Sequence, residues 1–310
     1  MRRALILIAL GLAAGGCSLR GEVETRRFDL AWVVAVTGIP AAADSAVIWI
    51  PVPQERPEQR VPDLQVMTDH PWVRVVDPDF GNVLIRVTVA DPPESVGVRV
   101  TARVERFPVT APVPESLSHL QTDLYLREEA LVSLSPRIRA LADSLDGDHR
   151  RRYEYVLGAM DYDTTAPGWG RGDTERARAV GKGNCTDYHS LFMSLSRAVG
   201  VPAVFEMGYA TRPDGETDRE GGYHCWAWFY RDGAWVPVDI SEADRNPERA
   251  GFYFGNLDPD RITFSRGRDV RLPGMQGPPL NFLPVSAYAE VDGRPFAGIR
   301  RTLTYRVEAG

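Results

Sequence analysis

Apolar side chains recur at every second position through much of the first hundred residues. In the runs that begin at Phe28 and at Val96, every other residue is apolar over nine positions. Successive side chains of a strand point to opposite faces of its sheet, so this period predicts strands with one buried and one exposed face. Clusters of Pro, Gly, Asp and Asn separate the runs, as turns do. We therefore expect residues 22–112 to form an antiparallel β-sandwich.

The apolar pattern changes to a helical period after a linker that carries three prolines between residues 108 and 114. Ser135 followed by Pro136 provides an N-cap with proline at the first helical position, and a second helical segment follows. Strand-like runs return after Pro202, and we expect the C-terminal ones to complete or flank a second sheet. The chain is therefore assigned to the α+β class, with a second domain over residues 115–310 that ends in a strand extension.

The first seventeen residues have the three parts of a bacterial export signal. Met1-Arg2-Arg3 is charged, residues 4–14 are apolar, and Gly15-Gly16 supplies small residues before Cys17. The apolar run is too short to span a bilayer as a stable anchor. Its arrangement resembles a lipoprotein signal, in which Cys17 is lipidated and becomes the mature N-terminus. We expect an exported protein, lipid-anchored and facing the periplasm or cell exterior; the alternative is an ordinary cleaved signal with an incidental cysteine.

Charge and motif content exclude several function classes. The 36 Lys and Arg against 42 Asp and Glu give a net charge of 36 − 42 = −6, with no basic block of the kind that binds nucleic acid. The sequence has no glycine-rich phosphate loop and no acidic cluster with calcium-loop spacing. We therefore expect no nucleic-acid partner, no cofactor and no metal requirement.

Cys185 stands where a loop is predicted to become a helix. Apolar residues from Tyr188 to Val199 follow it at helical spacing, which predicts a helix buried on one side. Asn184 is a good N-cap, and Asp187 stands where it could complete a capping box, so Cys185 would be the first helical residue. Free backbone N–H groups and the positive end of the helix dipole favour the thiolate there. Cys185 is thus predicted to be a nucleophile.

A cysteine nucleophile needs a base, and the base needs a group that orients its ring. The dipeptide Asp232-Gly233 predicts a two-residue hairpin turn between two strand-like runs. Closing that hairpin places His224 diagonally across from Asp239 on one face of the sheet, within reach of an imidazole–carboxylate hydrogen bond. The hairpin would therefore supply both the base and its orienting carboxylate.

Two alternatives compete with a Cys-His-Asp site. In an oxidising compartment Cys185 and Cys225 could form a disulfide, but strand alternation sends Cys225 to the face opposite His224, which disfavours the bond and makes Cys225 a small buried hydrophobe. The four-residue spacing of Cys185 and His189 would suit a zinc site completed by His224 and Asp239. No CxxC or HExxH motif supports that zinc site.

These segments resemble the transglutaminase-like superfamily, a relative of the papain-like cysteine proteases. The resemblance covers roughly Leu124 to Ala243 and rests on Gly183-x-Cys185-x-Asp187, the stretch from Ser196 to Ala203, His224-x-Trp226, and Trp235 to Asp239. It implies a core of helices packed on an antiparallel sheet, with Cys185 as nucleophile, His224 as base and Asp239 as orienting group. The sequence departs from the pattern at Cys225, where alanine is commoner.

The resemblance implies cysteine-dependent acyl transfer on peptide amides through a thioester. Either water or an amine would resolve that thioester, which makes the protein a hydrolase or protease in the first case and a transglutaminase in the second. At the cell envelope we expect a peptide or protein substrate, with peptidoglycan peptides among the candidates. The alternative from another class is a catalytically silent binding or scaffold module at the envelope.

Overall fold

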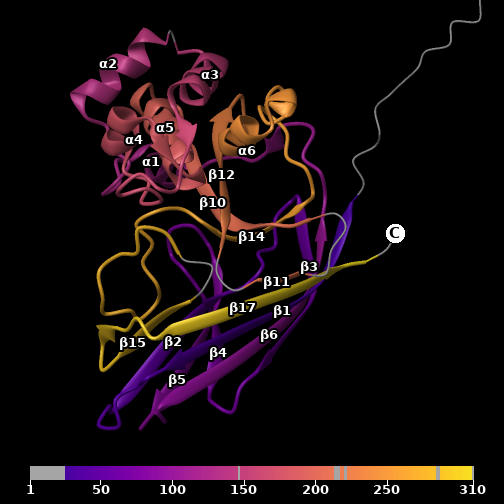
Figure 1. Ribbon diagram of the computed structural model, residues 1–310, viewed down its shortest axis with the longest axis vertical. Helices are drawn as coiled ribbons and strands as arrows, with labels where there is room; N and C mark the ends of the chain where they lie inside the picture. The colour runs from indigo at the N-terminus through magenta and orange to yellow at the C-terminus, as the bar shows by residue number, and fades with distance from the viewer. Residues whose placement is uncertain (1–24, 146, 213–216, 220–221, 284–286, 309–310) are drawn as a thin grey trace, which may run out of the picture.

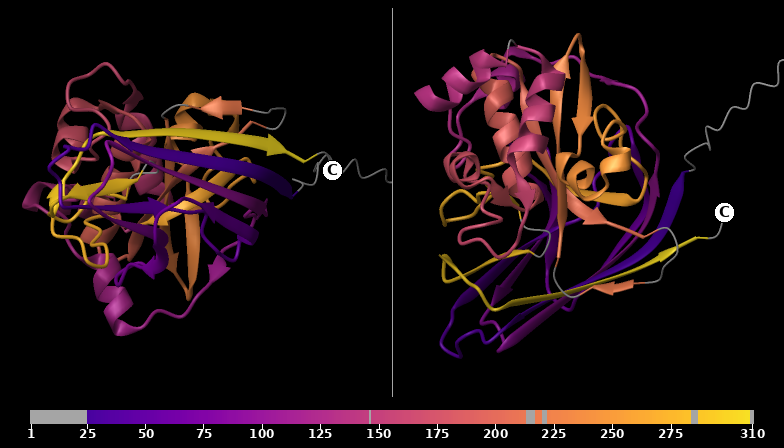
Figure 2. Two further views of the ribbon diagram at one scale, coloured as in Figure 1. Left: turned by 90° about the horizontal axis from the view of Figure 1, so that it is seen from below. Right: turned by 45° about the horizontal axis from the view of Figure 1, so that its top comes forward.

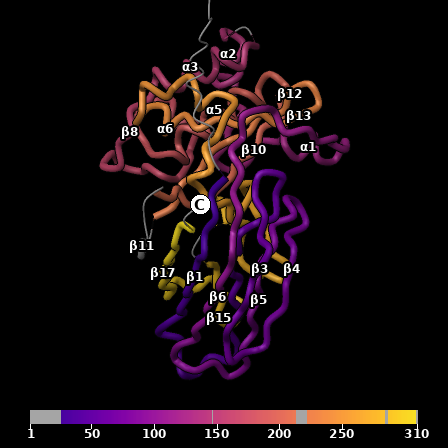
Figure 3. The backbone as a smooth tube through the Cα atoms, turned by 90° about the vertical axis from the view of Figure 1, so that its right-hand side faces the viewer, coloured from indigo at the N-terminus to yellow at the C-terminus, as the bar shows by residue number. Residues whose placement is uncertain are grey.

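The computed structural model describes residues 25–145, 147–212, 217–219, 222–283 and 287–308, and these form a β-sandwich joined to a helical region built on a third sheet (Figure 1). In side view the helical region lies at one end of the long axis and the sandwich at the other (Figure 3). The predicted export signal and its Cys17 lie outside the described residues. Within those ranges, no helix has the length and hydropathy to cross a bilayer.

The sandwich consists of two five-stranded antiparallel sheets, in the orders β11-β17-β1-β6-β3 and β16-β15-β2-β5-β4. As predicted, every second residue of β6 is buried, because one face of each sheet packs on the other. Buried side chains from both sheets, among them Trp32 and Ile48, share one core. The strands from the first third of the chain are β1 Arg26–Thr37, β2 Ser45–Pro51, β3 Gln59–Met67, β4 Trp72–Val76, β5 Val83–Ala90 and β6 Ser95–Arg106.

The C-terminal strands divide between the two parts of the molecule. Strand β14, Arg261–Arg266, joins the third sheet as expected. By contrast, β15 (Tyr288–Val291) pairs with β2, and β17 (Ile299–Val307) pairs with β1 along nearly its whole length. The expectation that these two strands complete or flank the sheet of the second domain is therefore wrong. Alternation predicts that one face of a strand is buried, but it does not say which sheet the strand joins.

Strand β17 carries a further short partner, and β15 ends in a hairpin. The remaining sandwich strands are β11 Thr217–Arg219, which pairs with β17, and β16 Arg294–Pro295, which pairs with β15. Strands β1 and β17, the first and last in the described residues, thus lie side by side, and the helical region comes between them in the sequence.

The third sheet, in the order β14-β10-β12-β13-β7, carries the helices. Its strands besides β14 are β7 Val113–Pro114, β10 Ala203–Ala210, β12 His224–Arg231 and β13 Ala234–Val238. The helices are α1 His119–Leu126, α2 Pro136–Ser144, α3 His149–Ala159, α4 Thr174–Val180, α5 Cys185–Ala198 and α6 Ile240–Arg245, with a 3-10 turn at Pro247–Arg249. A two-residue parallel pair joins β8 Asp161–Tyr162 to β9 Lys182–Gly183. Part of the proline linker, β7, is therefore a strand.

Helix α5 lies at the centre of the helical region. It packs on β10 and β12, and α2, α3, α4 and α6 also contact it (Figure 2). Every residue from Cys185 to Arg197 is buried. The expectation of a helix buried on one side only is wrong, because neighbouring helices cover the face that does not meet the sheet. Burial on all sides fixes the start of α5 firmly relative to the sheet.

The hairpin between β12 and β13 has the predicted turn and register. Asp232 and Gly233 both have positive φ, at 51° and 81°, as a tight two-residue hairpin requires. Trp228 pairs with Pro237, and the described ladder runs as far as Ala227 opposite Val238. The residues just beyond this ladder are those expected to form the site.

Candidate active site

Cys185 is the first residue of α5, as predicted. The Asn184 side chain accepts a hydrogen bond from the Thr186 N–H at 2.9 Å, and Asp187 Oδ2 accepts from the Asn184 N–H at 3.0 Å. The capping box is therefore complete, and it holds the loop before the cysteine in one conformation. Only 2% of Cys185 is exposed.

His224 and Asp239 meet at the open end of the hairpin. His224 begins β12, Asp239 follows β13, and His224 Nε2 lies 2.7 Å from Asp239 Oδ2. Asp239 also caps α6, because its Oδ1 accepts the Glu242 N–H at 3.1 Å. The predicted imidazole–carboxylate hydrogen bond is confirmed, and a carboxylate that caps a helix cannot rotate away from the ring.

The three side chains form an ion-pair network with Cys185 at one end. Burial alone would raise the pKa of the Cys185 thiol, but hydrogen bonds from Cys225 and His224 and the charge of His224 bring it down to about 6. Burial would lower the pKa of His224, but the charge and hydrogen bond of Asp239, together with Cys185, raise it to about 10. Between these values the sulfur is a thiolate and the imidazole is protonated, the charge state that a cysteine nucleophile requires.

Arg261, which the sequence analysis did not single out, anchors the carboxylate end of the network. Its Nη1 donates to Asp239 Oδ2 at 2.9 Å and its Nη2 donates to Asp258 Oδ1 at 3.1 Å. Burial would raise the pKa of Asp239, but His224, Arg261 and His189 hold it well below its usual range. Arg261 lies 22 residues after Asp239 on β14, and nothing in the sequence spacing signals that the two meet.

Cys225 lies on the face of β12 opposite Trp226 and the His224 ring, as strand alternation predicts. It packs against the first turn of α5, with its Sγ 3.7 Å from Thr186 Oγ1 and 3.9 Å from His189 Nδ1, and its thiol hydrogen-bonds to Cys185. Both cysteines are free thiols. The prediction that they form no disulfide is therefore confirmed, but the expectation that alternation keeps Cys225 away from Cys185 is wrong, because the face of β12 that carries Cys225 packs on α5. His224 is the first residue of its strand, so its ring can reach beyond the sheet end while Cys225 faces the helix.

His189 is not arranged as a metal ligand. Its Nδ1 lies 2.7 Å from the Cys185 carbonyl oxygen, and its Nε2 accepts the Ile240 N–H at 3.0 Å. With both ring nitrogens occupied by the backbone, the ring has no lone pair to offer a zinc ion. Among the residues that the structure describes, no group of three or more His, Cys, Asp or Glu side chains is arranged to hold a metal.

Two buried charged side chains, Asp187 and Arg268, hold the loop at residues 170–172 beside the start of α5. The Asp187 carboxylate accepts the N–H groups of Gly170 at 2.7 Å and Gly172 at 3.0 Å. On the other side, Arg268 donates to the carbonyl oxygens of Arg171 and Gly172 at 3.2 and 3.3 Å. Peptide dipoles thus solvate both charges, and the loop has little freedom next to α5. Arg268 was not predicted from the sequence, because its partners lie about a hundred residues away.

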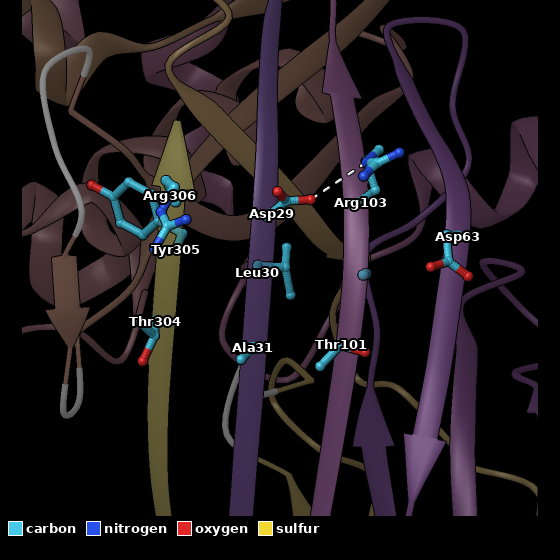
Figure 4. Close-up of a pocket in the computed structure, with 10 residues that line it drawn as sticks. Asp29, Leu30, Ala31, Asp63, Thr101, Arg103, Thr304, Tyr305 and Arg306 are labelled. Atoms are coloured by element: carbon cyan, nitrogen blue, oxygen red, sulfur yellow. Dashed lines mark hydrogen bonds and ion pairs between the residues drawn. The ribbon is translucent and has the colours of Figure 1, made fainter. Parts of the chain in front are cut away.

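Two cavities bear on where a substrate could bind. One of about 220 Å³ is lined by His224 together with Thr211, Asn246, Tyr253 and others from the same region. A larger hollow of about 380 Å³ crosses the outer face of β17, β1, β6 and β3, where Figure 4 shows a row of charged side chains. The larger hollow has none of the three predicted site residues in its lining, so the smaller cavity is the one that adjoins the chemistry.

Comparison with known proteins identifies the helical region. Residues 133–240 match the model of the transglutaminase-like superfamily, and this stretch contains Cys185, His224 and Asp239. This segment belongs to the transglutaminase-like superfamily. The structure brings these three residues together in one network.

Relatives of the transglutaminase-like segment extend over more of the chain. An uncharacterized protein of Haemophilus influenzae is 34% identical in an alignment of 177 residues that covers 46% of this chain, and the chain spans only about half (48%) of that relative. A crystal structure from Cytophaga hutchinsonii, of a protein provisionally named a cysteine protease, superposes with a TM-score of 0.58 at 13% identity. The superposition covers 91% of this chain and 98% of that one, so the fold of both the sandwich and the helical region occurs in a second protein.

Proposed function

We propose that the protein is a cysteine-dependent acyltransferase acting on peptide amides, with Cys185 as nucleophile, His224 as acid and base, and Asp239 as the group that orients His224. One observation carries the proposal: a thiol at a helix N-terminus is hydrogen-bonded to an imidazole whose Nε2 lies 2.7 Å from a buried carboxylate. Unpaired structural cysteines have no reason to be placed in such a network.

The geometry supports a two-step reaction. The Cys185 thiolate attacks the amide carbonyl carbon, and the negative charge that forms on the oxygen is stabilised at the N-terminus of α5, where the cap takes the Thr186 N–H and leaves the Cys185 N–H for the oxyanion. The amide C–N bond then breaks, and the His224 imidazolium gives its proton to the leaving amine. Neutral His224 next takes a proton from water or from a primary amine, which attacks the thioester and releases Cys185.

We expect the substrate to reach the sulfur of Cys185 from the side of His224. Cys185 is almost fully buried, whereas His224 lines the cavity of about 220 Å³. We place the leaving amine in this cavity, because His224 must reach it with a proton. The deep burial of Cys185 is also the observation that favours the second candidate, a catalytically silent binding or scaffold module.

We further propose that the protein works at the cell envelope, anchored by a lipid on Cys17. The support is the sequence pattern of residues 1–17. Cys17→Ser should move the protein from the membrane fraction to the soluble fraction of the cells. Membrane association that is unchanged in Cys17→Ser would remove this part of the proposal.

The reaction itself is tested with a peptide library supplemented with a primary-amine probe, analysed by mass spectrometry. New peptide termini indicate a hydrolase, and amine incorporation indicates a transglutaminase. Either product should form with the wild-type protein and be absent with Cys185→Ala. If neither product forms, or if Cys185→Ala forms as much product as the wild type, the protein is instead a catalytically silent binding or scaffold module.

A further inference from the structure

His189 is a buried histidine that the proposed reaction does not use. It lies one helical turn after Cys185 in α5, it is fully buried, and its ring points toward the start of α6. A buried imidazole with no chemical task is costly to desolvate unless both of its nitrogens find partners. The two partners of His189 therefore show what the ring does.

The hydrogen bonds of His189 define its tautomer. Because the Ile240 N–H can only donate, Nε2 must be the acceptor and carries no proton. The proton is then on Nδ1, which donates to the Cys185 carbonyl oxygen at 2.7 Å. Burial lowers the pKa of His189 to about 4, so the ring is neutral and this arrangement persists at neutral pH.

The two partners of His189 lie in α5 and at the start of α6, and the β12–β13 hairpin does not connect these two helices. The β12–β13 hairpin fixes His224 relative to Asp239, but Cys185 comes from α5 and is far away in sequence. His189 connects the main chain of Cys185 to the main chain of Ile240, the residue directly after Asp239. Its Nε2 also lies 3.7 Å from Asp239 Oδ1.

We propose that His189 is a positioning residue: a neutral imidazole that connects the nucleophile's backbone to the backbone beside the orienting carboxylate and so sets the spacing of the Cys185–His224–Asp239 network. The inference rests on the proposed function for its consequence in catalysis. The spacing itself can be tested through the ionisation of Cys185, which depends on how closely His224 is held to the sulfur.

Two conservative variants divide the connection into its halves. His189→Asn keeps a donor near the position of Nδ1 and loses the acceptor for Ile240, whereas His189→Gln places an amide oxygen near the position of Nε2 and loses the donor to Cys185. Met193→Ala is the control, because it removes a fully buried side chain from the same helix without touching either partner. If one histidine variant does not fold, the other still tests the proposal.

The readout is the pH dependence of Cys185 alkylation by iodoacetamide, followed by mass spectrometry of the purified protein. The titratable or charged groups that face the His189 ring are Asp239, His224, Arg261 and Cys225, and none of them is changed in these variants. The midpoint for Cys185 should rise by about one pH unit in His189→Asn or His189→Gln, a tenfold loss of thiolate at low pH, and stay unchanged in Met193→Ala.

Midpoints in both histidine variants equal to that of the wild type would overturn the positioning role. Thermal unfolding of the three variants measures how much stability each one loses. If the Cys185 midpoint of Met193→Ala rises as much as that of the histidine variants, the rise follows from lost stability and the proposal is overturned. Failure of the proposed function looks different. In that case the wild type forms neither cleaved nor amine-modified peptide, whatever the midpoints of the His189 variants.

Discussion

His224 Nε2 and Asp239 Oδ2 lie 2.7 Å apart, with both side chains buried. Because Asp239 occupies Nε2, Nδ1 is the ring nitrogen left for Cys185. Asp239 cannot leave the ring without giving up its cap of α6 and its bond to Arg261. The orientation of the imidazole is therefore set by the fold and does not depend on a bound substrate.

Asp239→Asn should lower kcat by about a hundredfold or more and leave KM nearly unchanged. Asparagine keeps the size of the side chain but removes the charge that raises the pKa of His224, so the imidazolium and the thiolate are both lost near neutral pH. Steady-state kinetics on any peptide that reacts in the library screen measures the effect. Asp232→Asn makes the same chemical change at the exposed hairpin tip and should have wild-type kinetics. Equal kcat values in the two variants would contradict the role of Asp239.

Activity should be confined to a pH window bounded by Cys185 and His224. Below about pH 6 the thiol is protonated and cannot attack; above about pH 10 the imidazolium has lost the proton that the leaving amine needs. A plot of kcat/KM against pH should therefore rise through the lower value and fall through the upper one. A profile that keeps rising through pH 8 or 9, as for an ordinary thiol, would show that Cys185 is not activated.

Cys225→Ala should remain active and raise the pKa of Cys185. The Cys225 thiol is held protonated, because burial and the neighbouring Cys185 raise its pKa well above the usual value, and it contributes a hydrogen bond that stabilises the Cys185 thiolate. Alanine removes that bond but keeps the backbone N–H of residue 225. Loss of all activity in Cys225→Ala, with the fold intact by circular dichroism, would instead give Cys225 a direct part in the reaction.

Arg261→Met should destabilise the protein by about 3–5 kcal/mol, because it leaves the buried carboxylates of Asp239 and Asp258 without their shared cation. Arg245→Met is the matched control: Arg245 makes an exposed pair with Glu242, which is worth under about 1 kcal/mol. Urea unfolding of the two variants provides both numbers. Similar losses of stability in the two variants would mean that Arg261 does not stabilise the buried carboxylates of Asp239 and Asp258.

Gly208→Ala tests the bulge that brings β10 and β14 together behind His224. A Cβ at this position would lie 1.8 Å from the Ile262 carbonyl oxygen, so the two strands would have to separate. We expect a loss of more than about 2 kcal/mol or insoluble protein. Gly97→Ala in β6 has open space around the new methyl group and should be close to neutral. If Gly208→Ala unfolds at the same urea concentration as Gly97→Ala, the close approach does not exist in solution.

Local sequence patterns predicted the parts of the site that local structure fixes. Asn184 and Asp187 identified the helix start at Cys185, and the Asp232-Gly233 turn set the hairpin register that brings His224 to Asp239. In these cases the interactions that fix the geometry lie within about fifteen residues of each other. Capping and turn chemistry are short-range, so they can be derived from one stretch of sequence.

Long-range partners could not be predicted in the same way. Arg261 reaches Asp239 from another strand, and Arg268 reaches the Gly170–Gly172 loop from about a hundred residues away. The same is true of β17, whose alternation fits any sheet with an uncovered edge. The contact between Cys225 and Cys185 was not predicted for a different reason: alternation assigns Cys225 to one face of β12, but it does not say that this face packs on the start of α5. Such contacts depend on how whole elements pack.

The most direct test of the account is the pH dependence of iodoacetamide alkylation at Cys185 and Cys225 in the wild-type protein, measured separately for each cysteine by mass spectrometry. We predict that Cys185 reacts with a midpoint near pH 6, while Cys225 stays unmodified up to alkaline pH. Reaction of Cys185 only above about pH 8.5, as for an ordinary thiol, would contradict it.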